Sequence, residues 1–152
     1  MKRTRPTIAG LSLLGRSEAA LPASPADARL EVFPNPQPKR GYWIHLDCPD
    51  FTSLCPVTGQ PDFARITIDY IPGQKCLETK ALKFYLAAFR NEPAFNEAVI
   101  NRILDDLVRA CRPKVMRVEG KFSPRGGLGL AVVAEHPRPG AAATAPKFWR
   151  GK

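Results

Sequence analysis

The sequence predicts an α+β fold in which two helices cover one face of a four-stranded antiparallel sheet. Residues 64–71 alternate between apolar and polar side chains, the pattern of a half-buried antiparallel strand. Residues 95–111 carry an apolar stripe at helical spacing. Two more strand patterns, at 115–122 and 128–135, are joined by a tight turn at 123–127. With one earlier strand and one earlier helix the chain order is ββααββ, a layer of helices on a sheet.

The first two strands are predicted at residues 42–47 and 64–71. The earlier run is rich in aromatic and β-branched side chains. The later run separates into two faces, with Ile66, Ile68 and Tyr70 on one and Arg65, Thr67 and Asp69 on the other. Pro72 and Gly73 end it. Four short strands leave two sheet edges open, and open edges favour pairing with other subunits.

The two helices are predicted at residues 80–90 and 95–111. Pro113 follows the second helix and ends it. Its apolar stripe consists of Phe95, Val99, Ile100, Ile103, Leu104, Leu107, Val108 and Cys111. A stripe of this length packs on the sheet and gives the domain its core.

Proline content and charge divide the chain into three parts. Residues 1–39 are a proline-rich irregular arm with a short element near 30–33, residues 40–136 are the folded domain, and residues 137–152 are a flexible basic tail. Of the net charge of +9, the first 40 residues and the tail each hold +4, which leaves +1 for the rest. The basic excess therefore lies outside the folded body, and direct nucleic-acid binding by the domain is not expected.

Targeting and metal patterns point to a reduced, cytoplasmic protein. No apolar run approaches the roughly 20 residues that span a bilayer, and no convincing signal peptide follows the basic N-terminus. The four cysteines form no CxxC pair, and there are only two histidines, so the sequence predicts no metal site.

The turn-rich loop predicted at residues 51–62 is the strongest candidate for chemistry. It contains one thiol, Cys55, directly before Pro56, and one carboxyl group, Asp62, directly after Pro61. A thiol that attacks an electrophilic carbon needs an acid to protonate the atom that receives the displaced electrons. The alternative is a cysteine that fills space and an ordinary turn aspartate.

A second candidate stretch follows at residues 77–85. Lys80 and Lys83 are three positions apart and share a helix face, where they could hold phosphates, or they belong to a solvated charged face. Arg125, beside two glycines, is a possible third anion contact. Glu97 and Glu78 are either helix-start carboxylates or acceptors for a guanine-like N–H edge.

These two stretches together resemble the motifs of the NADPH-dependent 7-cyano-7-deazaguanine reductases, the nitrile reductases of queuosine biosynthesis. The motifs are FTSLCPVTGQPDF at 51–63 and ETKALKFY at 78–85. The resemblance continues at 101–107 and 124–127, and it covers about residues 43–135, in the single-domain form of the family. Thr79 replaces the usual Ser or Leu, and Asn96 stands where some relatives have histidine, so proton transfer at that position is in doubt.

The resemblance implies the tunnelling fold, whose subunits join edge to edge into rings with sites at the interfaces. It implies that Cys55 forms a thioimidate with the nitrile carbon and that Asp62 is the general acid. Two hydrides from NADPH would complete the reduction to the amine. The implied substrate-binding residues are Leu77, Glu78, Thr79, Asn96 and Glu97, and the implied NADPH contacts are Lys80, Lys83 and Arg125.

Two other function classes stay open at this point. One is an amidino-type transferase on the same fold, in which an amine or ammonia releases the thioimidate without reduction. Such relatives should lack the 78–85 motif, which this chain retains. The other is a non-catalytic nucleic-acid-binding module, suggested by a pI of about 9.8 but opposed by the near-neutral body.

Overall fold

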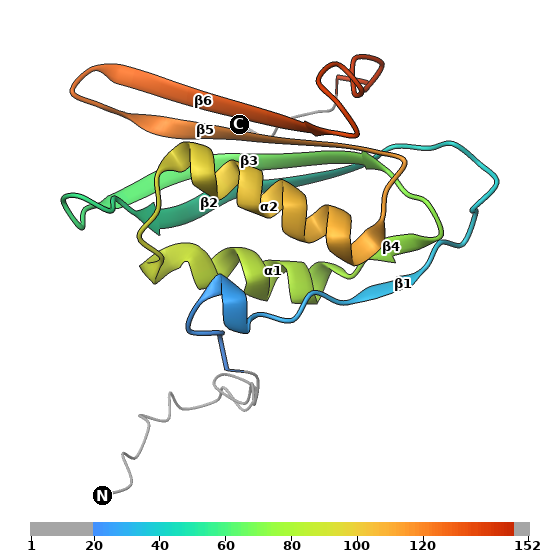
Figure 1. Cartoon of the computed structure of the whole chain (residues 1–152), viewed down its shortest axis with the longest axis horizontal. Coiled ribbons are helices and arrows are strands. Elements are labelled where there is room, and N and C mark those ends of the chain that lie inside the picture. Colours follow the sequence, from blue (N-terminus) through green and yellow to red (C-terminus); the bar gives the residue numbers. More distant parts are fainter. Residues whose placement is uncertain (1–19, 148–152) are drawn as a thin grey trace, which may run out of the picture.

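The computed structural model describes residues 20–147 of the chain. Four antiparallel strands form one sheet in the order β2-β3-β5-β6 (Figure 1). These strands are β2 (Ile44–Leu54), β3 (Pro61–Ile71), β5 (Val115–Arg125) and β6 (Leu128–His136). The helices α1 (Thr79–Ala87) and α2 (Asn96–Cys111) are inserted between β3 and β5 and lie on one face of the sheet. The predicted α+β architecture is confirmed.

The core lies between the sheet and the two helices. Ile66, Ile68 and Tyr70 of β3 face the helices and are buried, as their alternation predicts. The α2 stripe is also buried for the most part, but Phe95 is 62% exposed. Its inclusion in the stripe was wrong because Phe95 is the N-cap residue and its backbone is extended, so its side chain leaves the helix face.

Close approach of α2 to the sheet depends on Gly120 of β5. A Cβ atom at this position would lie 2.4 Å from Cδ1 and 2.9 Å from Cγ1 of Ile100. Both distances are shorter than a carbon–carbon contact allows. Ile100 therefore fills the space that the missing side chain leaves, and α2 sits directly on β5.

The face of β3 that points away from the helices is more buried than predicted. Thr67 and Asp69 are 2% and 4% exposed, although the alternation predicted a half-buried strand. Side chains on the neighbouring strands cover them, including His45, whose Nδ1 lies 2.5 Å from Asp69 Oδ1. On the other side, Asp69 stands opposite Arg117 in the register of β3 and β5. Single-strand periodicity cannot show how long neighbouring side chains cover a polar position.

The loop that carries Cys55 is shorter than predicted. Residues 51–54 belong to β2 and residues 61–62 to β3, so only 55–60 connect the strands and the predicted loop at 51–62 was wrong. A register shift between Cys48 and Phe51 lets β2 continue past Pro49. Phe51 then packs on Phe89, with ring centroids 5.5 Å apart. Pro49 therefore lies at a bulge and Pro61 at a strand start, and Pro56 alone of these prolines stays in the loop.

The helix predicted at 80–90 is α-helical only to Ala87. A 3-10 turn, η2 (Ala88–Asn91), continues it. The short strand β4 (Lys75–Leu77), which precedes α1, was not predicted, because three residues give no readable alternation.

A short strand pair joins the arm to the body. It contains the 3-10 turn η1 (Pro25–Asp27) and the strand β1 (Val32–Pro34), and β1 pairs antiparallel with β4. Asn35 fixes the end of this pair. Its Nδ2 donates to Gly73 O at 2.8 Å, and its Oδ1 accepts from Tyr42 Oη at 2.6 Å and from Gln37 N at 2.9 Å. The short element predicted near 30–33 thus corresponds to β1.

Beyond β6, residues 137–144 form consecutive bends and turns, and Ala142 is 5% exposed. The prediction that no signal peptide is present falls on residues outside the described range, as do parts of the arm and the tail. Within residues 20–147, no helix has the length and apolar character needed to cross a membrane.

Candidate active site

The segment between β2 and β3 is closed by its own backbone hydrogen bonds. Cys55 N–H donates to Gln60 O at 2.8 Å, and Gly59 N–H donates to Cys55 O at 2.9 Å. Gly59 has a φ of +70°, a left-handed conformation that glycine adopts without strain. This closure presents the half-buried Cys55 at the end of the sheet.

The environment of Cys55 favours its thiolate form. Hydrogen bonds lower the pKa of Cys55 to about 7, first from the Thr58 side chain and then from the backbone amides of Thr58 and Val57. The Arg125 side chain contributes in the same direction. A thiol with a pKa near neutrality is a reactive nucleophile at physiological pH.

Two other cysteines have the opposite tendency. Burial raises the pKa of Cys48, and it raises the pKa of Cys111 to about 12. Cys111 belongs to the core, as its place in the apolar stripe predicts, and Cys48 is half-buried. Cys55 therefore stands apart from these two thiols, because its surroundings favour the thiolate.

Asp62 lies at the start of β3 and faces an arginine. Its side chain is 11% exposed, and Arg125 Nη2 is 2.8 Å from Asp62 Oδ1. The same Nη2 lies 3.4 Å from Gln60 O, the carbonyl that also accepts from Cys55. Arg125 ends β5 just before Gly126 and Gly127, whose φ angles of +54° and +80° allow the tight turn into β6. Cys55, Asp62 and Arg125 thus form one cluster.

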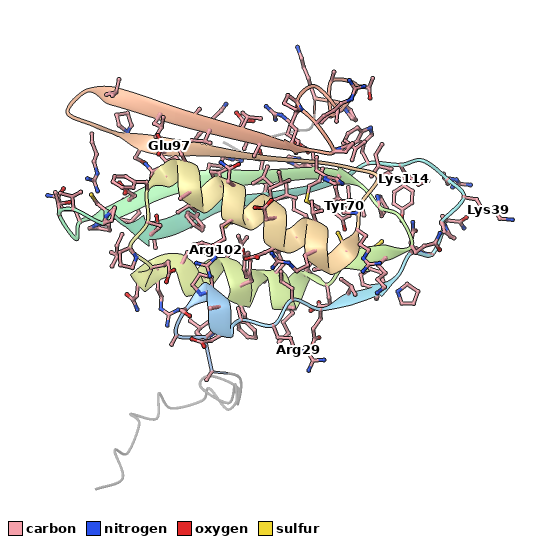
Figure 2. The ribbon with its side chains drawn as sticks, in the orientation of Figure 1. Arg29, Lys39, Tyr70, Glu97, Arg102 and Lys114 are labelled. Atoms are coloured by element: carbon pink, nitrogen blue, oxygen red, sulfur yellow. The ribbon has the colours of Figure 1, made fainter. Side chains whose placement is uncertain are left out.

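The start of α2 lies at this same end of the molecule. Leu54 N–H donates to Glu92 O and Ala94 N–H donates to Leu54 O, both at 3.1 Å, so the segment before α2 runs beside the end of β2. Asn96 and Glu97 begin the helix, and Glu97 is exposed (Figure 2). The Oδ1 atom of Asn96 is buried and accepts no hydrogen bond from any described residue.

The other predicted substrate-binding residues lie at the opposite end of α1. Leu77 is buried in β4, and Glu78 is the N-cap of α1. The two Glu78 carboxylate oxygens accept from Lys80 N and Ala81 N at 2.8 Å each, and these bonds lower the pKa of Glu78. Thr79 follows as the first residue of α1. One chain therefore does not bring residues 77–79 together with Cys55.

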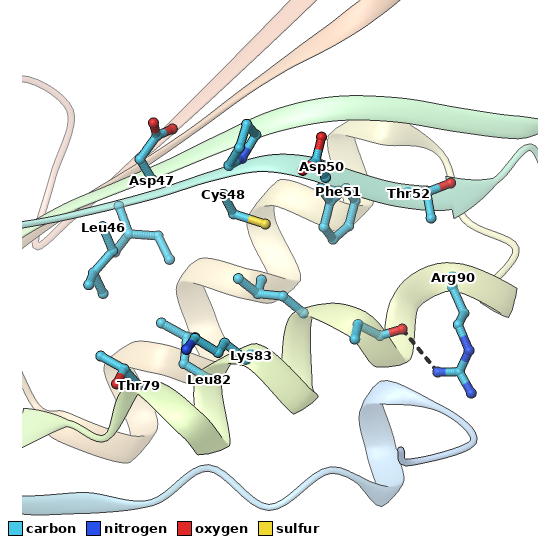
Figure 3. A pocket seen from close by; sticks show the side chains of 14 residues that line it. Leu46, Asp47, Cys48, Asp50, Phe51, Thr52, Thr79, Leu82, Lys83 and Arg90 are labelled. Atoms are coloured by element: carbon cyan, nitrogen blue, oxygen red, sulfur yellow. Dashed lines mark hydrogen bonds between the residues drawn. The ribbon is translucent and has the colours of Figure 1, made fainter. Parts of the chain in front are cut away.

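A pocket of about 460 Å³ opens between α1 and β2 (Figure 3). Leu46 and Phe51 of β2 face Leu82 of α1 across it, and Thr79 and Lys83 lie on the α1 side. Apolar walls suit a planar ring and Lys83 suits an anionic group, while Asp47 and Asp50 of β2 also line the pocket.

The three predicted cofactor contacts separate in the structure. Lys83 lines the pocket, Lys80 is exposed on the first turn of α1, and Arg125 is paired with Asp62. No cluster of three or more His, Cys, Asp or Glu side chains suited to a metal ion occurs within residues 20–147.

Sequence reasoning missed two residues of the cluster. Thr58 makes the strongest contribution to the lowered pKa of Cys55, and its place three residues after the cysteine in a proline-framed loop was an available signal. Ser53 is paired across the strands with Asp62 and is fully buried. Its hydroxyl has no hydrogen-bond partner among the described residues, and nothing in the sequence indicates that burial.

Fold and cluster together define a class of protein. An α+β chain that places a thiolate-forming cysteine beside an aspartate and an arginine has the groups of a cysteine-dependent enzyme acting on an electrophilic carbon. Comparison with known proteins gives the family. Residues 61–141 match the family described as QueF-like protein.

Two relatives of this chain share one name. The chain is 55% identical to the NADPH-dependent 7-cyano-7-deazaguanine reductase of Alkalilimnicola ehrlichii, over 78% of this chain and 91% of the relative. It is 57% identical to that of Nitrosomonas europaea, over 74% and 81%. A crystal structure of an apo archaeosine synthase QueF-Like superposes with a TM-score of 0.59 at 25% identity, over 64% of this chain and 95% of that one. The chain belongs to the family of NADPH-dependent 7-cyano-7-deazaguanine reductases.

Proposed function

We propose that this chain reduces the nitrile of 7-cyano-7-deazaguanine to the primary amine, with NADPH as the reductant, in queuosine biosynthesis for tRNA modification. Relatives more than 50% identical that carry this name support the activity. The observation that carries the chemistry is the lowered pKa of Cys55 within a cluster that contains Asp62.

The chain's own residues account for activation of the nitrile. The Cys55 thiolate attacks the nitrile carbon, and an S–C bond forms while one C–N π pair moves onto nitrogen. Asp62 in its protonated form supplies the proton that this nitrogen takes, which gives a thioimidate. When bound, NADPH supplies two hydrides in succession, through an imine to the amine. After the first hydride the C–S bond breaks, Cys55 leaves as a thiolate and the carbon becomes the imine. The second hydride and one more proton from solvent complete the amine, and Asp62 must take up a proton from solvent before the cluster can react again.

Residues at both ends of α1 support a site shared between copies of the chain. Asn96 and Glu97 lie at the same end of the molecule as Cys55, where the exposed carboxylate of Glu97 can accept from the base and the Oδ1 of Asn96 is a buried acceptor with no described partner. Leu77–Thr79 lie one helix length away, about 13 Å for nine residues. A small base cannot touch both sets in one chain. We propose that a second copy supplies the missing set.

Exposed apolar side chains at the Cys55 end support this assembly. Val57, Phe95 and Leu128 are 78%, 62% and 77% exposed. Large apolar side chains exposed together mark a contact surface. The edge strands β2 and β6 offer pairing groups as well, so we propose a ring-forming homo-oligomer. A monomeric mass by light scattering at micromolar concentration would contradict it.

We propose that the enzyme has no direct nucleic-acid partner and that it acts in the cytoplasm. A near-neutral folded body supports the first point, because phosphate binding needs basic side chains gathered on one face. The second suits a nucleophilic thiol that must stay reduced.

A second candidate is an amidino-type transferase, favoured by the structural likeness to an archaeosine synthase QueF-Like. In that case ammonia or an amine would displace Cys55 from the thioimidate. The much lower identity to that protein and the retained motif at 78–85 favour the reductase.

The test is NADPH oxidation followed by absorbance with 7-cyano-7-deazaguanine as substrate. We expect oxidation by the wild type, none by Cys55→Ala, and strongly reduced oxidation by Asp62→Ala.

Cys76→Ala is the thiol control, because Cys76 is buried in β4 away from the cluster, and it should retain activity. Lys80→Ala should weaken NADPH binding more than adduct formation. A wild type that consumes no NADPH but releases an amidine with ammonia would establish the transferase instead.

A further inference from the structure

Arg125 contacts the nucleophile's loop and the acid at the same time. Its Nη2 lies 2.8 Å from Asp62 Oδ1 and 3.4 Å from Gln60 O, and its side chain also helps to stabilise the Cys55 thiolate. Gln60 O is the acceptor of the Cys55 N–H bond that closes the loop. One guanidinium therefore bridges β5, the loop and β3.

Arg125 is the basic side chain that contacts this cluster. Among the other charged side chains at this end, Glu92 is paired with Arg102 at 2.8 Å, and Glu97 is exposed at the start of α2. The nearest basic neighbour along β5 is Lys121, which lies 3.6 Å from Glu119. Removing Arg125 would leave the carboxylate of Asp62 without the ion pair that orients it.

Arg125 is the more exposed member of the ion pair. Its side chain is 40% exposed, whereas that of Asp62 is 11% exposed, so Arg125 can turn toward solvent while Asp62 keeps its place at the start of β3. Arg125 must leave Asp62 before it contacts a cofactor phosphate, so Asp62 and the phosphate compete for the same guanidinium group.

We propose that Arg125 is a positioning residue for the first step, in which it holds Asp62 and the Cys55 loop together before any cofactor contact. This inference rests on the proposed function and deepens it, because it assigns Arg125 to thioimidate formation in the absence of NADPH. A residue that serves only the cofactor would not affect that step.

The experiment measures adduct formation by intact-protein mass after mixing with 7-cyano-7-deazaguanine, without NADPH, between about pH 5 and pH 9. For Arg125→Gln we expect a rate at least roughly tenfold lower near pH 7 and a rise in rate displaced to higher pH, because the thiolate loses one stabilising partner. Arg125→Lys should recover part of the rate, since it restores the cation but not the planar donor pair. Lys121→Gln, on the same strand, is the matched control and should behave as wild type.

The outcomes separate this inference from the proposed function. Wild type that forms an adduct while Arg125→Gln forms it equally fast at every pH would leave the function standing and overturn the inference. Wild type that forms no adduct would overturn both. Loss of rate in Arg125→Gln without displacement of the pH profile, and without recovery in Arg125→Lys, would indicate a merely structural role and also overturn it.

Discussion

Replacing Thr58 by valine tests why Cys55 is reactive. The substitution keeps the shape of the side chain but removes the hydroxyl, which makes the largest contribution to lowering the pKa of Cys55 from 9.0 to about 7. Backbone amides of Val57 and Thr58 and the side chain of Arg125 remain. The pKa of Cys55 should therefore rise but stay below 9.0.

The thiolate fraction gives the size of the effect. With a pKa of about 7, about half of Cys55 is thiolate at pH 7. A rise of one unit would leave roughly a tenth, so the rate of alkylation by iodoacetamide at pH 7 should fall roughly fivefold. Near pH 10 the two proteins should react at similar rates, because both thiols are then ionised.

The assay follows carboxamidomethylation of Cys55 by peptide mass spectrometry across pH. Cys48 and Cys111, whose pKa values are raised by burial, serve as internal references that should react slowly at pH 7. Thr58→Ser retains the hydroxyl and should react like wild type. Equal rates for wild type and Thr58→Val at pH 7 would refute the role of the hydroxyl, and a loss that persists near pH 10 would indicate changed access instead.

Three further predictions concern stability and are measured by urea denaturation. Gly120→Ala should destabilise the fold by about 1–3 kcal/mol, because the new Cβ would meet Ile100 at 2.4 Å and push α2 from the sheet; an unchanged midpoint would show that α2 adjusts freely. Ser53→Ala should change stability by less than about 1 kcal/mol, since no described residue bonds the buried hydroxyl; a larger loss would reveal a partner for it. Asn35→Ala should cost about 2–3 kcal/mol and expose the arm to protease, because Tyr42, Gln37 and Gly73 each lose a hydrogen bond to Asn35; unchanged proteolysis would mean that the other contacts of the arm suffice to hold it.

Helix and strand order could be predicted because each long element shows its own period. The stripe of α2 and the alternation of β3 reflect burial against one continuous core, which local sequence records. Burial of Asp69 could not be predicted, because it depends on His45 and Arg117 from neighbouring strands. The extent of β2 was hidden by Pro49 at a register shift, and a bulge has no alternation of its own.

The candidate site was only partly accessible to sequence reasoning for a related reason. The residue types at Cys55 and Asp62 suggest a nucleophile and an acid without any geometry. The contact between Arg125 and Asp62 joins residues 63 positions apart through the register of β3, β5 and the glycine turn, so it exists only in the folded chain. The separation of the predicted substrate-binding residues likewise depends on the fold. Glu78 caps the start of α1 and Glu97 begins α2, and their short separation in the sequence does not show that the length of α1 lies between them.

The most direct measurement is the mass of the intact protein after incubation with 7-cyano-7-deazaguanine alone, with peptide mapping of the modified residue. Covalent capture of the nitrile predicts that wild type gains the mass of one substrate molecule and that the gain maps to Cys55. Cys55→Ala should gain nothing, and Asp62→Asn should gain mass more slowly. An unmodified wild type, or an equal gain in Cys55→Ala, would contradict it.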